Sequence, residues 1–87
     1  MLAYLGLASE PAQVQSISAD RVMLKTNRPY APGLRMSIEF VNSTRTFKCI
    51  LRLQVEDVQP NPEGGYALDA AFRRPLTDDE LRNLVSD

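Results

Sequence analysis

Residues 14–26, VQSISADRVMLKT, decide the fold more than any other stretch of this chain. Apolar and polar residues alternate on both sides of a polar centre, which predicts a strand, a tight turn and a second strand. Ser16, Ser18 and Asp20 have short polar side chains, which bond to nearby backbone amides in tight reversals. The basic Arg21 follows, where a turn of this kind usually has glycine. We expect two antiparallel strands joined by a turn that these polar side chains stabilise.

The chain after this turn keeps the two-residue period that is typical of strands with one buried face. A polar turn at residues 42–44 predicts a hairpin, and the glycines of residues 61–65 predict a second turn. Pro29 and the pair Pro32-Gly33 mark the connection into the first strand of the hairpin. The side chains expected to face the core are Leu34, Met36, Ile38, Phe40, Phe47, Cys49, Leu51, Leu53, Val55, Tyr66, Leu68, Ala70 and Phe72.

The C-terminal residues change to a helical period. Thr77 and Glu80 match a capping box, in which the threonine hydroxyl caps a helix amide and the glutamate reaches back. Leu81, Leu84 and Val85 then form one apolar stripe, which should dock on the sheet because so short a helix is marginal alone. The sequence therefore predicts one mainly β domain over residues 1–87, a small, strongly curved antiparallel sheet or barrel with a terminal helix.

Composition excludes several classes of protein. The chain has 87 residues and a net charge of −1, so it lacks the excess of Lys and Arg that non-specific nucleic-acid binders need. Its single cysteine fits a reducing compartment, and we expect a cytoplasmic protein. No apolar run approaches the roughly 20 residues of a membrane span. The apolar start, MLAYLGLA, lacks the basic residues of a signal peptide and is expected to be a first strand or a packed arm.

Catalytic and metal-binding patterns are nearly absent from the sequence. The chain contains no histidine, the commonest general base at neutral pH and a common zinc ligand. Cys49 is expected to be a core residue with a protonated thiol. Asp78, Asp79 and Glu80 are best explained by the first turn of a helix, where negative charge complements the helix dipole. We therefore expect a protein that is not an enzyme and that has no catalytic residues, no metal site and no cofactor.

The order of these elements resembles the PilZ domain, a six-stranded barrel that usually serves as a receptor for cyclic di-GMP. The resemblance covers residues 12–85, and its carriers are SIS followed by ADRVMLKT, the loop RPYAPGLRMSIEF, and GGYALDAAF before the helix. It implies an antiparallel PilZ-like β-barrel of about six strands with a short C-terminal helix. The segment 1–8 either completes this barrel or is the remnant of a longer N-terminus.

The resemblance also places the nucleotide-binding motifs of the family on this chain. One motif is an Arg-x-x-x-Arg pair, which has no counterpart because no arginine precedes Arg21. The other is Asp or Asn, any residue, Ser, two residues and Gly, which falls on Ser16, Ser18 and Arg21. Only Ser18 keeps the family residue, since Ser16 replaces the acid or amide and Arg21 replaces the glycine.

Loss of the arginine pair has a large expected effect on nucleotide affinity. Each charge-assisted hydrogen bond of an arginine is worth roughly 1.5–3 kcal/mol, so two lost arginines correspond to about two to four decades of affinity. Arg21 would weaken binding further if its position needs positive φ, which costs a residue other than glycine roughly 1–2 kcal/mol. Alternatively, Arg21 or Arg28 could supply a replacement cation, provided that the geometry also matches.

Three functions from different classes follow. The first is a non-enzymatic PilZ-like interaction module in a bacterial cyclic-di-GMP network, which contacts protein partners and binds the nucleotide weakly or not at all. The family includes such motif-less members. The second is a cyclic-di-GMP receptor with an altered site. The third is a small barrel that stacks single-stranded nucleic acid on aromatic rings, which the inward positions of Phe40, Phe47 and Phe72 disfavour. The outward Ile50, Ala67 and Ala71 suggest a partner site or a patch under the helix, and Ile50 with the terminal helix makes a homodimer plausible.

Overall fold

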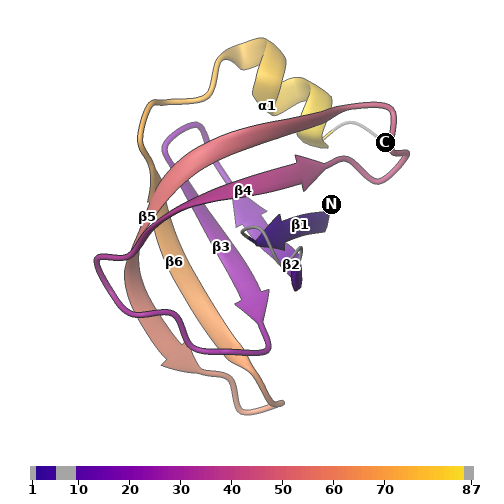
Figure 1. Ribbon diagram of the computed structural model, residues 1–87. Coiled ribbons are helices and arrows are strands. Elements are labelled where there is room, and N and C mark those ends of the chain that lie inside the picture. The colour runs from indigo at the N-terminus through magenta and orange to yellow at the C-terminus, as the bar shows by residue number, and fades with distance from the viewer. Residues whose placement is uncertain (1, 6–9, 86–87) are drawn as a thin grey trace.

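The computed structural model describes residues 2–5 and 10–85 of the chain as a small, strongly curled β structure with one helix (Figure 1). The polypeptide is mainly β and antiparallel, and it ends in a short α-helix, as the sequence predicts. Its elements are β1 (Leu2–Leu5), β2 (Glu10–Ile17), β3 (Arg21–Thr26), β4 (Arg35–Val41), β5 (Lys48–Pro60), β6 (Tyr66–Phe72) and α1 (Asp78–Val85).

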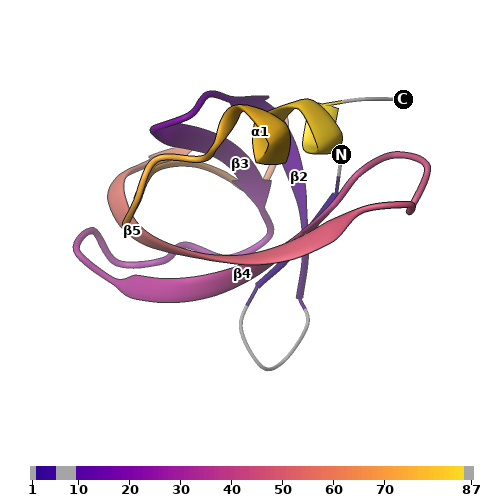
Figure 2. The same cartoon turned by 90° about the horizontal axis from the view of Figure 1, so that it is seen from above.

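Five strands, β2 to β6, form a single curled sheet in the order β2-β3-β6-β5-β4. The short strand β1 pairs antiparallel with β2 on one side and with β4 on the other, so the hydrogen-bonded ladder closes on itself. Seen from above, the strands curl around a common centre, and α1 lies across one end of the curled sheet (Figure 2). The expected strand or packed arm at the start of the chain is therefore a strand over Leu2–Leu5.

Strand β5 is the longest element, and it pairs with a different neighbour on each of its edges. Its first half pairs with β4, from Val41↔Lys48 to Arg35↔Gln54, while its second half pairs with β6, from Leu53↔Phe72 to Pro60↔Tyr66. The register shifts between Val55 and Asp57, and a bulge of this kind bends a strand and increases its twist. Leu53 and Gln54 pair with β4 and with β6, so these two strands lie along opposite edges of β5.

The core lies inside the curl and follows the predicted alternation. Phe40 and Phe72 meet there edge to face, with ring centroids 5.9 Å apart. Leu34 is the exception among the predicted core residues, because it is 41% exposed and precedes the first residue of β4. The Pro32-Gly33 connection explains this position: Gly33 N donates to Val55 O, which holds Leu34 in a loop at the rim of the sheet. The buried apolar residues are Ala12, Val22, Leu24, Ile38, Phe40, Val41, Leu51, Leu53, Val55, Leu68, Ala70, Phe72, Leu76 and Leu84.

Helix α1 covers the open end of the core through Leu84, which is 1% exposed. Leu81 is half-buried against the core, but Val85 is 54% exposed, so the predicted three-residue stripe is wrong at its last member. Val85 lies in the final position of the helix, past the turn that contacts the sheet. The side chain of Asn42, at the end of β4, fixes the helix further, since its Nδ2 donates to Asn83 O at 3.2 Å.

The turn between β5 and β6 depends on its glycines. Gly64 N donates to Asn61 O at 2.9 Å, and Asn61 N donates to Gly65 O at 3.0 Å, which closes the reversal. Both glycines have positive φ, 103° at Gly64 and 73° at Gly65. A Cβ at Gly65 would lie 2.5 Å from the backbone O of Thr26, whereas a Cβ at Gly64 would meet nothing within 4 Å. Gly65 is thus required both for its φ and for the close approach of β3.

Candidate functional site

The turn between β2 and β3 holds the residues that the sequence singles out. Ser18 N donates to Arg21 O at 2.9 Å, and Arg21 N donates to the Ser18 hydroxyl at 3.2 Å, so Ala19 and Asp20 form a tight reversal. Ser18 therefore stabilises the turn through its own side chain, as turn chemistry predicts. Ser16 is exposed beside a register shift of β2 and makes no side-chain hydrogen bond to a residue in the described ranges. The structure joins Ser18 to Arg21, and Ser16 takes no part in these hydrogen bonds.

The backbone of this turn is bound to the segment that leads to the helix. Phe72 N donates to Asp20 O at 2.9 Å, and Leu76 N donates to Ala19 O at 2.8 Å. These bonds hold the two central residues of the turn without any glycine. Among the described residues other than glycine, only Arg45 has positive φ, so Arg21 carries no left-handed strain. The expected penalty for arginine in place of glycine does not arise in this turn.

Arg21 points along the outer face of the sheet toward two carboxylates. Its Nη2 lies 3.2 Å from Asp69 Oδ2 on β6 and also bonds Glu56 Oε1 on β5. The hydrogen bonds to Asp69 and Glu56, with their negative charges, raise the pKa of the Arg21 guanidinium further above its usual value. The guanidinium is therefore already engaged by two acidic groups.

Arg28, the second proposed replacement cation, lies far from the turn. Strand β3 begins at Arg21 and ends at Thr26, whose hydroxyl donates to Arg28 O at 2.8 Å. A strand advances about 3.3 Å per residue, so the five steps from Arg21 to Thr26 cover about 16 Å, and Arg28 follows this end of β3. Arg21 and Arg28 therefore lie toward opposite ends of β3, and the structure does not bring them together at the turn.

Sequence reasoning missed both acidic partners of Arg21. Asp69 lies on the outward row of β6 between Ala67 and Ala71. A single carboxylate in an otherwise apolar row could have indicated in the sequence that this position has a basic partner. Glu56 reaches Arg21 because of the bulge in β5, and a one-residue shift of register leaves no clear trace in an alternating pattern.

The catalytic candidates are explained by the fold. Cys49 is half-buried against the core, and burial, with a smaller contribution from the Glu80 carboxylate, raises the pKa of its thiol. A thiol with a raised pKa is a poor nucleophile at neutral pH. Residues 2–5 and 10–85 include no group of three or more potential metal-binding side chains.

The carboxylates at the start of α1 belong to the helix cap. Glu80 N donates to the Thr77 hydroxyl at 3.1 Å, and Thr77 N donates to Glu80 Oε1 at 3.0 Å, which confirms the capping box. Arg74 forms a two-pronged ion pair with Glu80, with bonds of 2.9 and 3.0 Å. These hydrogen bonds lower the pKa of Glu80 from its ordinary value to about 2, and the bonds from the Arg74 side chain contribute more than the bond from the Thr77 amide.

Glu80 therefore makes stability depend on pH. A carboxyl with a lowered folded-state pKa stabilises the fold fully above its unfolded pKa, and this contribution is lost as pH falls from about 4.5 toward 2. Over this pH interval we expect the free energy of unfolding to fall less for Glu80→Gln than for the wild type. The expected difference is about 1 kcal/mol, a small value because water screens the exposed Arg74. Urea unfolding at pH 5 and pH 3 measures the difference. Glu63→Gln, in the exposed β5–β6 turn, should follow the wild type; equal acid dependence of all three proteins would contradict the assignment.

The aromatic rings are placed for packing. Phe40 is fully buried, Phe72 is 9% exposed, and Phe47 is half-buried against the same core. Rings in these positions cannot present their faces to nucleotide bases, which single-stranded nucleic-acid binding requires. This arrangement disfavours the third hypothesis.

A second group of charged residues lies on the outer face of the sheet and was not predicted as a unit. Arg35 on β4, Arg52 on β5 and Arg73 after β6 line one shallow hollow of about 400 Å³. In the sequence Arg73 and Arg74 are simply two basic residues that follow the predicted strand ending at Phe72. The three strands follow one another in the sequence and are neighbours in the sheet, but which of their outward residues meet depends on the strand register.

Comparison of the chain with protein-family models, with curated proteins and with solved structures finds no match. No helix within the described ranges is long and apolar enough to cross a membrane.

Proposed function

We propose that this chain is a non-enzymatic PilZ-like module that acts in a bacterial cyclic-di-GMP network by contacting protein partners, with weak or no nucleotide binding of its own. The order of elements supports the family part of the proposal: a polar-turned strand pair, a Pro-Gly connection, a hairpin, a glycine turn, a strand that ends at Phe72, and a capped helix. The closure of the curled sheet by β1 is consistent with the six-stranded barrel that the resemblance implies.

The observation that carries the functional part is the engagement of Arg21 by Asp69 and Glu56. A receptor of this family needs free cationic groups for the phosphates of cyclic di-GMP, which carry negative charge. Here the only arginine of the motif region is neutralised, and a phosphate would approach two carboxylates that repel it. The Ser18 hydroxyl is also engaged, because it serves the turn.

The absence of the arginine pair adds to this effect. No arginine occurs before Arg21 in the sequence, so nothing in the first 20 residues can form the paired, planar hydrogen bonds that grip a phosphate or a guanine edge. The lack of histidine and the raised pKa of Cys49 support a role without catalysis.

Titration of the labelled protein with cyclic di-GMP tests the proposal. We expect no saturable change in the amide spectrum of residues 16–21 at low micromolar nucleotide, because the arginine pair is missing and Arg21 is held by carboxylates. Dispersed amide signals would show that the protein under test is folded.

A double variant tests whether the two carboxylates alone keep Arg21 from binding the nucleotide. Glu56→Gln with Asp69→Asn removes both carboxylates and leaves Arg21 free. Under the proposal this variant still binds cyclic di-GMP no more tightly than high micromolar. Saturable shifts of residues 16–21 in the wild type at low micromolar nucleotide would overturn the proposal in favour of a receptor with an altered site.

A further inference from the structure

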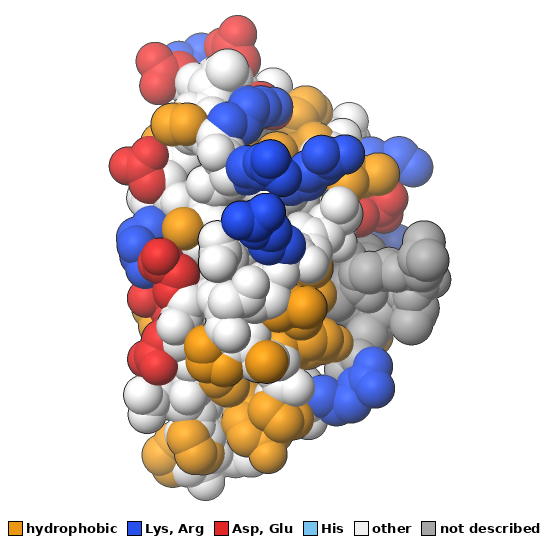
Figure 3. All heavy atoms as spheres, turned by 60° about the vertical axis from the view of Figure 1, so that its left-hand side comes forward, with side chains coloured by type: hydrophobic (Ala, Val, Ile, Leu, Met, Phe, Trp, Pro, Cys, Tyr) orange, Lys and Arg blue, Asp and Glu red, His pale blue; other side chains and the backbone are white. Residues whose placement is uncertain are grey.

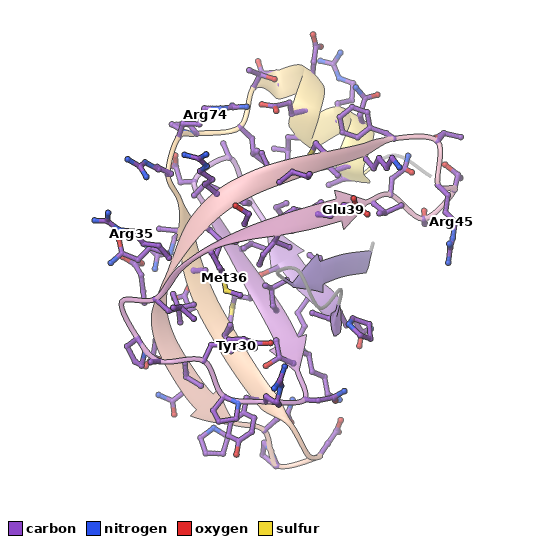
Figure 4. The ribbon with its side chains drawn as sticks, in the orientation of Figure 1. Tyr30, Arg35, Met36, Glu39, Arg45 and Arg74 are labelled. Carbon is purple, nitrogen blue, oxygen red and sulfur yellow. The ribbon has the colours of Figure 1, made fainter. Side chains whose placement is uncertain are left out.

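Arg35, Arg52 and Arg73, with the adjacent Arg74, form a basic surface on the outside of strands β4, β5 and β6, which we term the arginine face. Figure 3 shows basic side chains gathered on this side of the molecule, above a group of apolar ones. Figure 4 shows Arg35 and Arg74 projecting from the same side, whereas Arg45 lies at the distant tip of the β4–β5 hairpin.

Strand register places these side chains next to one another. Arg73 N donates to Arg52 O at 2.9 Å, so the two arginines occupy neighbouring positions on adjacent strands. Arg52 pairs with Ser37 of β4, and Arg35 lies two residues before Ser37 on the same outward row. The small side chains of Ser37 and Ala71 line the hollow between the arginines and leave its floor open.

Three of the four charges of this face have no ion-pair partner among the described residues. It holds four of the ten basic residues of a chain whose net charge is −1. Arg74 is paired with Glu80, but Arg35, Arg52 and Arg73 make no ion pair with a residue of the described ranges. Like charges on neighbouring strands repel one another and destabilise the sheet. A bound acidic group would relieve this repulsion, so the face is complementary to a negatively charged partner.

An apolar contact accompanies the charges. Ile50 is 69% exposed and shares a second shallow hollow of about 460 Å³ with Arg52, Arg73 and Arg74. Glu39 on β4 pairs with Ile50 on β5, and its negative charge bounds the arginine face on this side. An exposed isoleucine beside a row of arginines suits a ligand that carries an apolar side chain as well as carboxylates.

The spacing of the arginines fits an extended peptide. Neighbouring strands lie about 4.8 Å apart, so arginines on three adjacent strands span about 10 Å. Alternate side chains of an extended peptide are about 7 Å apart on one side, a spacing that long arginine side chains can match.

We propose that the arginine face docks an acidic segment of a protein partner, one that carries alternating carboxylates and at least one apolar side chain. This inference rests on the proposed function, in which the chain acts through protein partners, and it assigns the chemistry that those partners present.

Fluorescence anisotropy with a short fluorescein-labelled peptide of glutamates and leucines tests this inference on the full chain. We expect saturable binding at low salt that weakens as salt rises, because the attraction is electrostatic and exposed. Arg52→Gln with Arg73→Gln should weaken binding about tenfold, and Ile50→Ser should also weaken it. The matched control, Arg45→Gln with Arg82→Gln, removes the same charge elsewhere and should change the affinity less than twofold.

Three results would overturn the inference: no binding of the peptide by the folded chain, equal weakening in the control variant, or tighter binding of anionic phosphatidylserine vesicles or cyclic di-GMP to the same face. These outcomes are distinct from a failure of the proposed function. That failure appears as cyclic-di-GMP shifts at residues 16–21, which need neither Arg52 nor Arg73.

Discussion

Replacement of Gly65 by alanine is expected to lower the free energy of unfolding by about 2–5 kcal/mol. Two effects add at this position. Gly65 has a φ of 73°, which costs an L-residue roughly 1–2 kcal/mol, and the new Cβ would lie 2.5 Å from Thr26 O. Thr26 is buried at the end of β3 and pairs with Tyr66, so the carbonyl can retreat only if the strand moves. Such overpacking costs about 1–3 kcal/mol.

Gly64→Ala is the matched control for this change. Gly64 has a φ of 103°, but a Cβ there would meet nothing within 4 Å, so only the conformational penalty of about 1–2 kcal/mol applies. Urea unfolding followed by circular dichroism gives both values. Equal losses in the two variants would show that β3 does not approach Gly65 as closely as described.

Replacement of Asn42 by alanine is expected to destabilise the protein by about 3 kcal/mol. The side chain is buried and makes four hydrogen bonds at the end of β4. Its Oδ1 accepts from Thr46 N at 2.9 Å and Phe47 N at 3.1 Å, while its Nδ2 donates to the Thr46 hydroxyl and to Asn83 O. Alanine would remove the asparagine partner of Thr46 N, Phe47 N and Asn83 O, and a polar group that is left unpaired where water cannot reach it costs about 1–3 kcal/mol.

Thr44→Ala provides the comparison in the same turn. Thr44 is exposed, and its hydroxyl contacts only the Thr46 hydroxyl at 2.8 Å, so its loss should change the free energy of unfolding by less than about 0.5 kcal/mol. The same urea measurement applies. A loss below about 1 kcal/mol for Asn42→Ala would mean that water replaces the asparagine and that the turn does not depend on it.

Much of the fold follows from local sequence patterns. The alternation around Phe40, Leu51 and Leu68 identifies three strands and their buried faces, because one side of each strand packs on the core. The capping box at Thr77 and Glu80 predicts the start of the helix to the residue. These features depend on neighbours within a few positions of the chain, which the sequence displays directly.

Features set by distant segments could not be predicted in the same way. Leu34 continues an apolar alternation, yet it lies at the rim because the Gly33 turn bonds to β5. The acidic partners of Arg21 come from strands that are not its neighbours in sequence. For the candidate site, the pattern identifies the turn and the role of Ser18, but the state of Arg21 depends on the bulge in β5.

The strand order also determines how the folded surface can form. Strands β4, β5 and β6 are joined in sequence order and can assemble locally, as can β2 and β3, but the β3–β6 pairing joins residues such as Arg21 and Asp69, 48 positions apart. Such a long loop closure is slow and comes after local contacts. The ion pairs of Arg21 on β3 with Glu56 on β5 and Asp69 on β6 therefore join the β2–β3 pair to the β4–β6 group. A fragment containing either half alone would therefore lack them, and only the intact chain can present the turn and the arginine face together.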